Sequence, residues 1–231
     1  MNEIQRELLA GCAILDGERL TTAFGHLSAR TQEGILVSGN QGPGLVHGPQ
    51  DLVTVALGDG SLVAGERGRV PGELPIHLGI LARRPEVVSV CRFHGPACLA
   101  WATLGRPLPA TIGMGLFCGA LVPVYDTAKT VTTAAQGAEL AEVAGDGDAV
   151  LLRGFGAATA GRSVPEAVAR AWLLERSAAA CLAASAVGEP LAYTPREAAP
   201  FAAAQGPAAA QIERLWHYLC RRWPAPSGPP E

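Results

Sequence analysis

The chain has 231 residues, of which 48% are hydrophobic and 17% are charged, and its formal net charge is −3. This hydrophobic content excludes a disordered chain, and 28 glycines and 18 prolines without a repeat period exclude a collagen-like fibre. One domain is expected, because a single hydrophobic core can serve up to about 250 residues.

The distribution of charge excludes two classes of partner. The basic runs are the pairs Arg83-Arg84 and Arg221-Arg222, so the chain lacks the basic face that is typical of nucleic-acid binding. No apolar stretch approaches the roughly 20 residues that span a bilayer, and the polar residues 1–7 are unlike a signal peptide. We therefore expect a cytoplasmic protein that binds neither nucleic acid nor membranes. Its six cysteines are scattered without a CxxC pair, so we expect free thiols.

Hydrophobic periodicity predicts helices and strands that alternate along the chain, which favours an α/β or α+β fold. In the first half of the chain the predicted elements are a helix at 2–16, strands at 34–38 and 51–57, a hairpin turn at 58–60, a helix after residue 71, a strand at 87–93 and a helix that begins at residue 96. Short strands and turns are predicted at 109–125. In the second half they are a helix at 131–144, strands at 149–153 and 157–160, a long helix from the Ser163 cap to Ala186, and a last helix at 208–222. No element is predicted for 190–207. No linker interrupts this order, so we expect one domain at 1–223 and a flexible Pro-rich tail at 224–231.

Three stretches carry groups that can take part in chemistry. In the first, Gly25 precedes His26, Ser28 and Arg30, which together offer two hydrogen-bonding side chains and a guanidinium. Such a group can hold a phosphate or carboxylate, because arginine presents a planar fork of donors. A strand with a surface arginine is the structural alternative.

The second stretch, residues 71–77, places Glu73 at the start of a helix and His77 four residues later. A carboxylate at a helix start gains about 0.3–1 kcal/mol from the helix dipole, so this position alone accounts for Glu73 without a function. The functional interpretation makes Glu73 a general base. We interpret His77 as a packed or hydrogen-bonded structural histidine.

The third stretch, residues 88–96, is a predicted strand that ends in His94. Residues two apart on a strand point to the same side, so Arg92 and His94 share a face. A basic pair at a strand end can bind an anion or transfer a proton. Taken alone, a single histidine is more often a structural residue with its hydrogen bonds satisfied.

Together these stretches resemble the class II aldolase/adducin head family over residues 3–190. The segments that carry the resemblance are Gly25–Arg30, Ser38-Gly39, Gln50–Val55, Glu73–Leu78, Arg84–Val87, Leu151–Gly156 and Glu166–Val168. The family includes metal-dependent sugar-phosphate aldolases and epimerases, and decarboxylases of hydroxyaromatic acids. Because it carries His26, the first segment is similar to the decarboxylase-like branch.

The resemblance implies a fold and a set of substrate contacts. The fold is a three-layer α/β/α arrangement in which helices flank a central, mainly antiparallel sheet. The residues that the resemblance places at the substrate are His26, Ser28, Arg30, Ser38, Gly39 and Phe155.

The departures from the family pattern concern its divalent metal. The family holds the metal with a His-x-His pair at the strand end and a third His in a later turn, and this sequence has Arg92, His94 and Phe155 there. Arginine keeps its proton and phenylalanine has no donor atom, so His94 is the one ligand retained. A catalytic zinc site normally has three protein ligands, so we expect no cofactor.

The resemblance implies a lyase that acts on a small carboxylate-, phosphate- or hydroxyl-bearing substrate through an enolate or carbanion. In our leading hypothesis Arg92 replaces the charge of the metal, while Glu73 or His94 moves a proton. Phe155 would give the former metal pocket an apolar wall, suited to an aromatic or other non-sugar substrate. The reaction classes in keeping with this are decarboxylation, aldol or retro-aldol cleavage, dehydration and isomerisation. A Schiff base would depend on Lys129, the single lysine.

Two alternatives stay open. The chain can be a binding or scaffold homologue that kept the fold and lost catalysis, or a metal enzyme in which His26, Cys91 or Cys118 replaces the missing ligands to Zn, Mn or a similar ion. Family members are typically cyclic homotetramers with active sites at subunit interfaces, so the resemblance implies a homotetramer that acts on a small molecule. In the last helix, Trp216 and Trp223 are expected to serve packing.

Overall fold

The computed structural model describes residues 1–127, 129–202 and 207–225. Its helices are α1 (Glu3–Gly17), α2 (Leu74–Arg83), α3 (Pro96–Ala102), α4 (Ala134–Ala144), α5 (Val164–Ser185), α6 (Pro195–Ala202) and α7 (Pro207–Arg222). Its strands are β1 (His26–Thr31), β2 (Gly34–Ser38), β3 (Leu52–Val55), β4 (Leu62–Ala64), β5 (Ser89–Phe93), β6 (Leu108–Pro109), β7 (Leu121–Val122), β8 (Val124–Tyr125), β9 (Ala149–Leu152) and β10 (Gly156–Gly161). Short 3-10 helices are η1 (Pro43–Leu45), η2 (Pro49–Asp51), η3 (Arg67–Arg69) and η4 (Gly113–Cys118).

Local capping explains where the helices begin. The Asn2 side chain accepts from the backbone N–H of Gln5, and the Gln5 side chain accepts from the backbone N–H of Asn2. This capping box starts α1. Ser163 accepts from the backbone of Glu166 at the start of α5, the longest helix, as the Ser-x-x-Glu pattern predicts.

Three segments hold elements that the predicted order lacks: β1, β4 and a helix within residues 190–207. Residues 190–207, for which no element was expected, contain α6. Its start is marked by Thr194 and Glu197, whose side chains each accept from the backbone N–H of the other. Three flanking or internal prolines (positions 190, 195 and 200) mask this capping box in the sequence.

Eight strands form one sheet in the order β4-β3-β2-β1-β5-β10-β9-β8. The neighbours pair antiparallel except β8 and β9, which are parallel, and β6 and β7 form a small separate pair. The central strands β5 and β10 are buried along their whole length. The mainly antiparallel central sheet that the resemblance implied is therefore confirmed.

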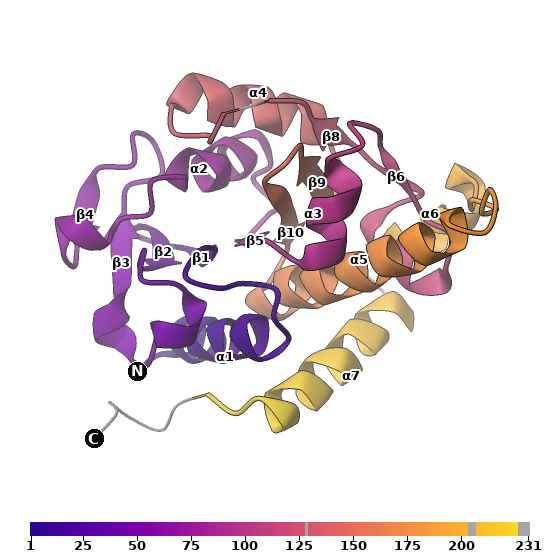
Figure 1. Cartoon of the computed structure of the whole chain (residues 1–231). Coiled ribbons are helices and arrows are strands. Elements are labelled where there is room, and N and C mark those ends of the chain that lie inside the picture. The colour runs from indigo at the N-terminus through magenta and orange to yellow at the C-terminus, as the bar shows by residue number, and fades with distance from the viewer. Residues whose placement is uncertain (128, 203–206, 226–231) are drawn as a thin grey trace.

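Helices cover both faces of this sheet and complete the three layers (Figure 1). On one face α2 and α4 pack over a core that includes Ile76, Val90 and Leu140; on the other, α1, α3 and α5 enclose a larger core. The helices α2 and α4 approach closely at two glycines: a Cβ on Gly79 would lie 2.2 Å from the Gly137 carbonyl oxygen, and a Cβ on Gly137 would lie 2.2 Å from the Pro75 carbonyl oxygen. α2 is thereby held firmly over the face that carries His26 and Arg92.

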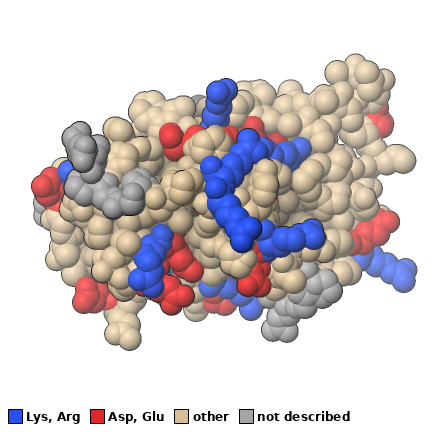
Figure 2. Space-filling view, turned by 90° about the horizontal axis from the view of Figure 1, so that it is seen from below, with Lys and Arg blue, Asp and Glu red and all other residues tan. Residues whose placement is uncertain are grey.

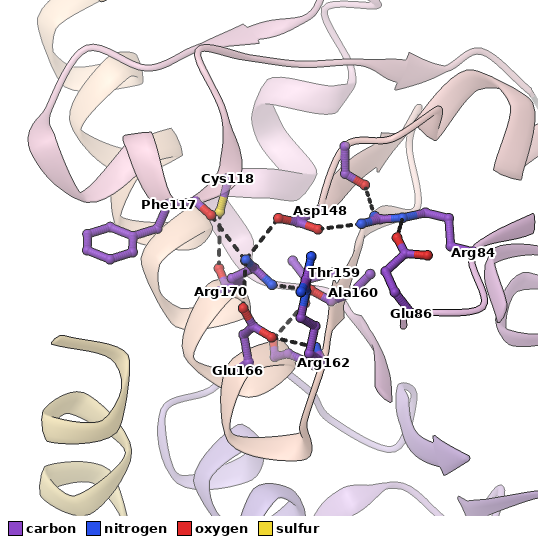
Figure 3. A network of polar contacts seen from close by, with 12 residues as sticks. Arg84, Glu86, Phe117, Cys118, Asp148, Thr159, Ala160, Arg162, Glu166 and Arg170 are labelled. Atoms are coloured by element: carbon purple, nitrogen blue, oxygen red, sulfur yellow. Dashed lines mark hydrogen bonds and ion pairs between the residues drawn. The ribbon is translucent and has the colours of Figure 1, made fainter. Parts of the chain in front are cut away.

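A buried network of ion pairs ties α5 to the sheet (Figure 3). The side chain of Arg170, 3% exposed, lies between two carboxylates, with Asp148 at 2.8 Å and Glu166 at 2.9 Å. Asp148 also contacts Arg84 at 3.0 Å, and Arg84 contacts Glu86 at 2.7 Å. Two segments that carry the family resemblance, at 84–87 and 166–168, therefore contribute structural contacts.

The buried carboxylate of Glu18 holds α7 against the rest of the molecule. It accepts from the indole N–H groups of Trp172 on α5 and Trp223 beyond α7, each at 2.9 Å, and contacts Arg176 and Arg222. Burial alone would raise the pKa of Glu18, but the two indole donors and the two arginines outweigh it and the pKa is lowered. Trp223 thus serves packing, as expected.

Both signs of charge occur on the side that carries α1, α5 and α7. Figure 2 shows that face, where a run of Lys and Arg side chains crosses the middle and Asp and Glu lie around it. Among the described residues, none of the helices has the length and apolar character needed to cross a membrane. The predicted tail at 224–231 falls largely outside the described residues, because the structure describes it only to residue 225.

Candidate active site

The candidate site lies where β1 begins beside the end of β5, beneath the start of α2. The register of the sheet places His26 directly opposite Arg92, and Arg92 opposite Ala158 on β10. Directly paired residues point to the same face of a sheet, so these side chains form a row on the side that α2 covers. Ser28, two residues after His26, lies on the same face.

Glu73 is the N-cap residue of α2, but its carboxylate does not cap the helix. No hydrogen bond runs from the side chain of Glu73 to the first turn of α2. Instead the carboxylate pairs with Arg92, with Oε2 and Oε1 lying 3.3 Å and 3.5 Å from Nη2. The Glu73 carboxylate therefore contacts strand β5 and does not cap the start of α2.

Arg92 is a buried cation with an incomplete set of partners. Its side chain is 0% exposed, and Nη1 donates to the carbonyls of Phe93 at 2.7 Å and Ala157 at 3.4 Å. Among the described residues Nε has no partner. Burial lowers the pKa of Arg92 and Glu73 partly opposes this, yet a guanidinium stays protonated at ordinary pH. Within the described part of the chain Glu73 is its one anionic partner, and the charge of Arg92 still lowers the pKa of His77 and His94.

His94 stands beside Arg92 just beyond the end of β5. Its backbone N–H donates to Leu20 O at 2.8 Å, which fixes the chain where the strand ends. Burial, together with the charge of Arg92, lowers the pKa of His94 to about 3, so the imidazole is neutral near pH 7. Its Nδ1 is buried without a partner among the described residues.

An aromatic residue that the sequence did not single out borders His94. Phe24 is 71% exposed and lies edge-on to the His94 ring, with the two centroids 6.3 Å apart. An exposed phenylalanine directly before the Gly25–Arg30 motif was the available signal. It offers an apolar surface next to the imidazole.

A buried chain of hydrogen bonds joins His26 to α2. His26 Nδ1 lies 2.6 Å from His77 Nε2, and His77 Nδ1 lies 2.6 Å from Ser28 Oγ. Burial lowers the pKa of His77 to about 3, and Arg92 adds to this. The pKa of His26 is lowered well below its usual value by burial, then by His77, Arg92 and His94. His77 is buried and hydrogen-bonded, and its partners are two of the predicted substrate-binding residues.

The turn between β9 and β10 brings Phe155 to the same region. Gly156 has φ +96°, and a Cβ there would lie 2.5 Å from Phe93 O and 3.4 Å from Arg92 Nη1, so this position excludes other residues. Phe155 is partly buried against the core beneath α2 and α4. Phe155 therefore directly precedes the glycine whose backbone approaches Arg92.

Three predicted substrate-binding residues have other contacts. Arg30 donates to Leu81 O at 2.7 Å and Val87 O at 3.2 Å, so its guanidinium holds the end of α2. The hydroxyl of Ser38, 0% exposed, accepts from the Leu27 amide at 2.9 Å. Gly39 donates through its backbone to Asp51 O at 3.0 Å. The structure does not bring Arg30 or Ser38 together with Glu73, Arg92 and His94.

The donor atoms at the family's metal position do not fit a divalent cation. Position 92 presents a guanidinium that repels a cation and position 155 an apolar ring, which leaves His94 as a single imidazole. Among residues 1–127, 129–202 and 207–225, no group of three or more His, Cys, Asp or Glu side chains is arranged to hold a metal ion.

The cysteines proposed as replacement ligands lie elsewhere. Cys91 alternates with Arg92 along β5 and faces the other core, and Cys118 directs its sulfur to Arg170 O at 3.6 Å. Burial raises the pKa of both thiols, that of Cys118 to about 12, which opposes the thiolate form that metals bind. Neither thiol joins His94.

Comparison with known proteins agrees with this architecture. Residues 6–182 match the family described as the Class II Aldolase and Adducin N-terminal domain. The chain is 34% identical over 189 residues to decarboxylase tropJ of Talaromyces stipitatus, with 72% of this chain and 70% of that protein covered. It is 32% identical over 208 residues to the 3,4-dihydroxyphthalate decarboxylase of Terrabacter sp., with 84% and 86% covered.

A solved structure shows the same fold at lower identity. L-fuculose 1-phosphate aldolase from Glaciozyma antarctica PI12 superposes with a TM-score of 0.81 and 22% identity, covering 97% of this chain and 91% of that chain. Identity at this level supports the shared fold alone. The two relatives named as decarboxylases are more similar in sequence than this aldolase.

Proposed function

Since the chain belongs to the class II aldolase and adducin family, we propose that it is a lyase that decarboxylates a hydroxyaromatic carboxylic acid through an enolate-type intermediate. The observation that carries the proposal is the buried cation Arg92, paired with Glu73 at 3.3 Å, at the strand end. The two relatives named as decarboxylases support the choice of decarboxylation over aldol cleavage.

The chemistry asks for a positive charge beside a ring oxygen and for a group that moves one proton. When the proton of a ring hydroxyl moves to the carbon that bears the carboxylate, the ring becomes a ketone and the C–COO⁻ bond can break. The electron pair of that bond returns to the ring, CO₂ leaves, and a phenolate remains until solvent protonates it. The barrier depends chiefly on how well the developing oxyanion is stabilised.

The roles of the residues follow from their contacts. Arg92 stabilises the ring oxyanion, which displaces the loosely held carboxylate of Glu73 from Nη2. Glu73, thereby released and 16% exposed, carries the proton from the hydroxyl oxygen to the ring carbon. His94, neutral and next to Arg92, is the second candidate for proton transfer. Phe24 borders His94 and suits an aromatic ring better than a sugar, and Phe155 lies in the β9–β10 turn next to Gly156, which approaches Arg92.

We extend the proposal to the cofactor. The reaction as written draws its positive charge from Arg92, and no step passes through a metal ion. The misfit between Arg92, Phe155 and a divalent cation supports a metal-independent enzyme. The homotetramer implied by the family resemblance remains part of this proposal, with the small-molecule site close to a subunit boundary.

The direct test is CO₂ release from a panel of hydroxyaromatic acids that begins with 3,4-dihydroxyphthalate. L-fuculose 1-phosphate serves as the aldol-cleavage substrate for comparison. In D₂O we expect one deuterium on the carbon that lost CO₂. Cleavage of the sugar phosphate without any decarboxylation would overturn the proposal, and binding of the acids without turnover would favour a binding homologue.

A second arm tests the cofactor. The protein is dialysed against a chelator and assayed before and after addition of Zn²⁺ or Mn²⁺. We expect turnover to survive chelation without loss. Activity that disappears with the chelator and returns with one metal would establish a metal enzyme with substituted ligands.

A further inference from the structure

The hydrogen-bond chain from Ser28 through His77 to His26 has a direction, which its buried end decides. Ser28 is 0% exposed, and among the described residues the sole partner of its Oγ is His77 Nδ1. A hydroxyl has one proton to donate. If Ser28 accepted from His77, that proton would be buried without an acceptor, which is the costlier arrangement.

The direction passes along the chain to His26. Ser28 Oγ–H donates to His77 Nδ1, so the proton of neutral His77 resides on Nε2. His77 Nε2–H then donates to His26 Nδ1. The proton of neutral His26 must therefore reside on Nε2.

The second ring nitrogen of His26, Nε2, is the one left to meet a ligand. Within the described part of the chain, Nε2 makes no hydrogen bond, and it is absent from the fully enclosed polar atoms that lack partners. His26 stands opposite Arg92 in the strand register, on the side covered by α2. An N–H donor and a guanidinium thus come from paired residues on one face of the sheet.

From this geometry we propose that Ser28 and His77 lock His26 as a neutral Nε2–H donor, which binds the substrate oxyanion together with Arg92. His26 is then a catalytic residue by hydrogen-bond donation, and His77 and Ser28 are positioning residues. The inference rests on the proposed function for the identity of the oxyanion, a phenolate oxygen. The direction of the hydrogen-bond chain is independent of it.

The same series of hydrogen bonds argues against His26 as a general base or a cationic acid. A second proton on His26 would sit on Nδ1 and face the N–H of His77 at 2.6 Å, so every hydrogen bond from His26 to Ser28 would have to reverse its direction. Burial and the neighbouring Arg92 favour the neutral ring in the same sense. A neutral imidazole that donates a hydrogen bond can stabilise an oxyanion without transferring a proton.

The test measures the tautomer directly, without reference to activity. The full chain, labelled with ¹⁵N-histidine, has five histidines, and His26 is assigned with His26→Gln. We expect the His26 proton on Nε2 in the wild-type protein and a mixture of tautomers in Ser28→Ala. Thr159→Val, which removes another 0%-exposed hydroxyl that donates to Ala167 O, is the matched control and should keep the wild-type tautomer. A His26 proton on Nδ1 in the wild type, or an unchanged tautomer in Ser28→Ala, overturns the lock.

A kinetic arm tests the role in catalysis. With an acid that the enzyme decarboxylates, Ser28→Ala should lower kcat by about 10- to 100-fold with little change in KM, because the lost donor acts on the transition state. Ser28→Thr retains the hydroxyl and should recover most of the rate. An equal effect of Thr159→Val, or failure of Ser28→Thr to recover kcat when its tautomer is wild-type, overturns the catalytic role. If no acid is turned over while the tautomer is as stated, the proposed function fails and the lock stands.

Discussion

The carboxylate of Glu73 and the guanidinium of Arg92 form an ion pair across the gap between α2 and β5, with Oε2 3.3 Å from Nη2. The side chain of the residue that begins α2 thus pairs with a residue of β5. The pair is unequal, since Arg92 is 0% exposed and Glu73 is 16% exposed. Glu73 is therefore the partner that can move when an anion arrives.

Removal of the charge at position 92 should separate catalysis from folding when side-chain volume is kept. We expect Arg92→Met to lower kcat by roughly 100- to 1,000-fold, as loss of an oxyanion donor does. Arg92→Ala should in addition lower the unfolding free energy by about 2–5 kcal/mol, because it leaves a cavity. Steady-state kinetics and urea denaturation measure the two effects. Arg106→Ala, which changes an exposed arginine stacked on Trp101, is the control, and near-normal turnover in Arg92→Met would contradict the oxyanion role.

Acid should destabilise the fold through His77. The pKa of His77 is about 3 in the folded protein and near 6.5 when unfolded, so between these values the unfolded chain binds the extra proton. Stability therefore falls as pH decreases from about 6.5 towards 3, by about 1.4 kcal/mol per pH unit for this residue. Urea denaturation at a series of pH values should show a shallower slope in His77→Gln. His217→Gln, at an exposed position on α7, controls for the number of histidines, and an unchanged slope in His77→Gln would refute the assignment.

The network around Asp148 should be costly to break. Asp148 contacts Arg170 at 2.8 Å and Arg84 at 3.0 Å, and the side chain of Arg170 is 3% exposed. Asp148→Ala leaves this buried cation with less compensation, so we expect a loss of about 3–5 kcal/mol in unfolding free energy. Glu142→Ala removes a surface partner of Arg83 and should cost at most about 1 kcal/mol. Equal effects of the two substitutions in chemical denaturation would show that the network contributes little.

Glu18 should determine how firmly α7 is held. Glu18→Ala leaves the indole N–H groups of Trp172 and Trp223 without their acceptor and removes the anion shared by two arginines. We expect a loss of about 2–3 kcal/mol in stability and faster proteolysis near residue 222. Limited proteolysis with mass spectrometry locates the cleavage. Glu213→Ala, an exposed change on α7 itself, should cleave like the wild type.

Local signals in the sequence were sufficient for most of the fold. Helix and strand periods depend on neighbours a few residues apart, and capping pairs such as Ser163 and Glu166 mark helix starts directly. α6 was missed because its prolines conceal the Thr194 cap. The sequence also predicts the loss of two family metal ligands, at Arg92 and Phe155, because neither residue type has a lone pair to offer a metal.

The sequence by itself therefore determined most of the elements, the family resemblance and the residue types at the strand end. Only the tertiary structure decided the partners. Arg30 donates to a carbonyl at the end of α2, and Glu73 pairs with Arg92. His77 makes hydrogen bonds with His26 and Ser28. These pairs are 19 to 51 residues apart in sequence, and their contacts depend on strand register and on the docking of α2 over the sheet. A hydrogen bond needs its two atoms placed within a few tenths of an ångström, which residue type and spacing do not specify.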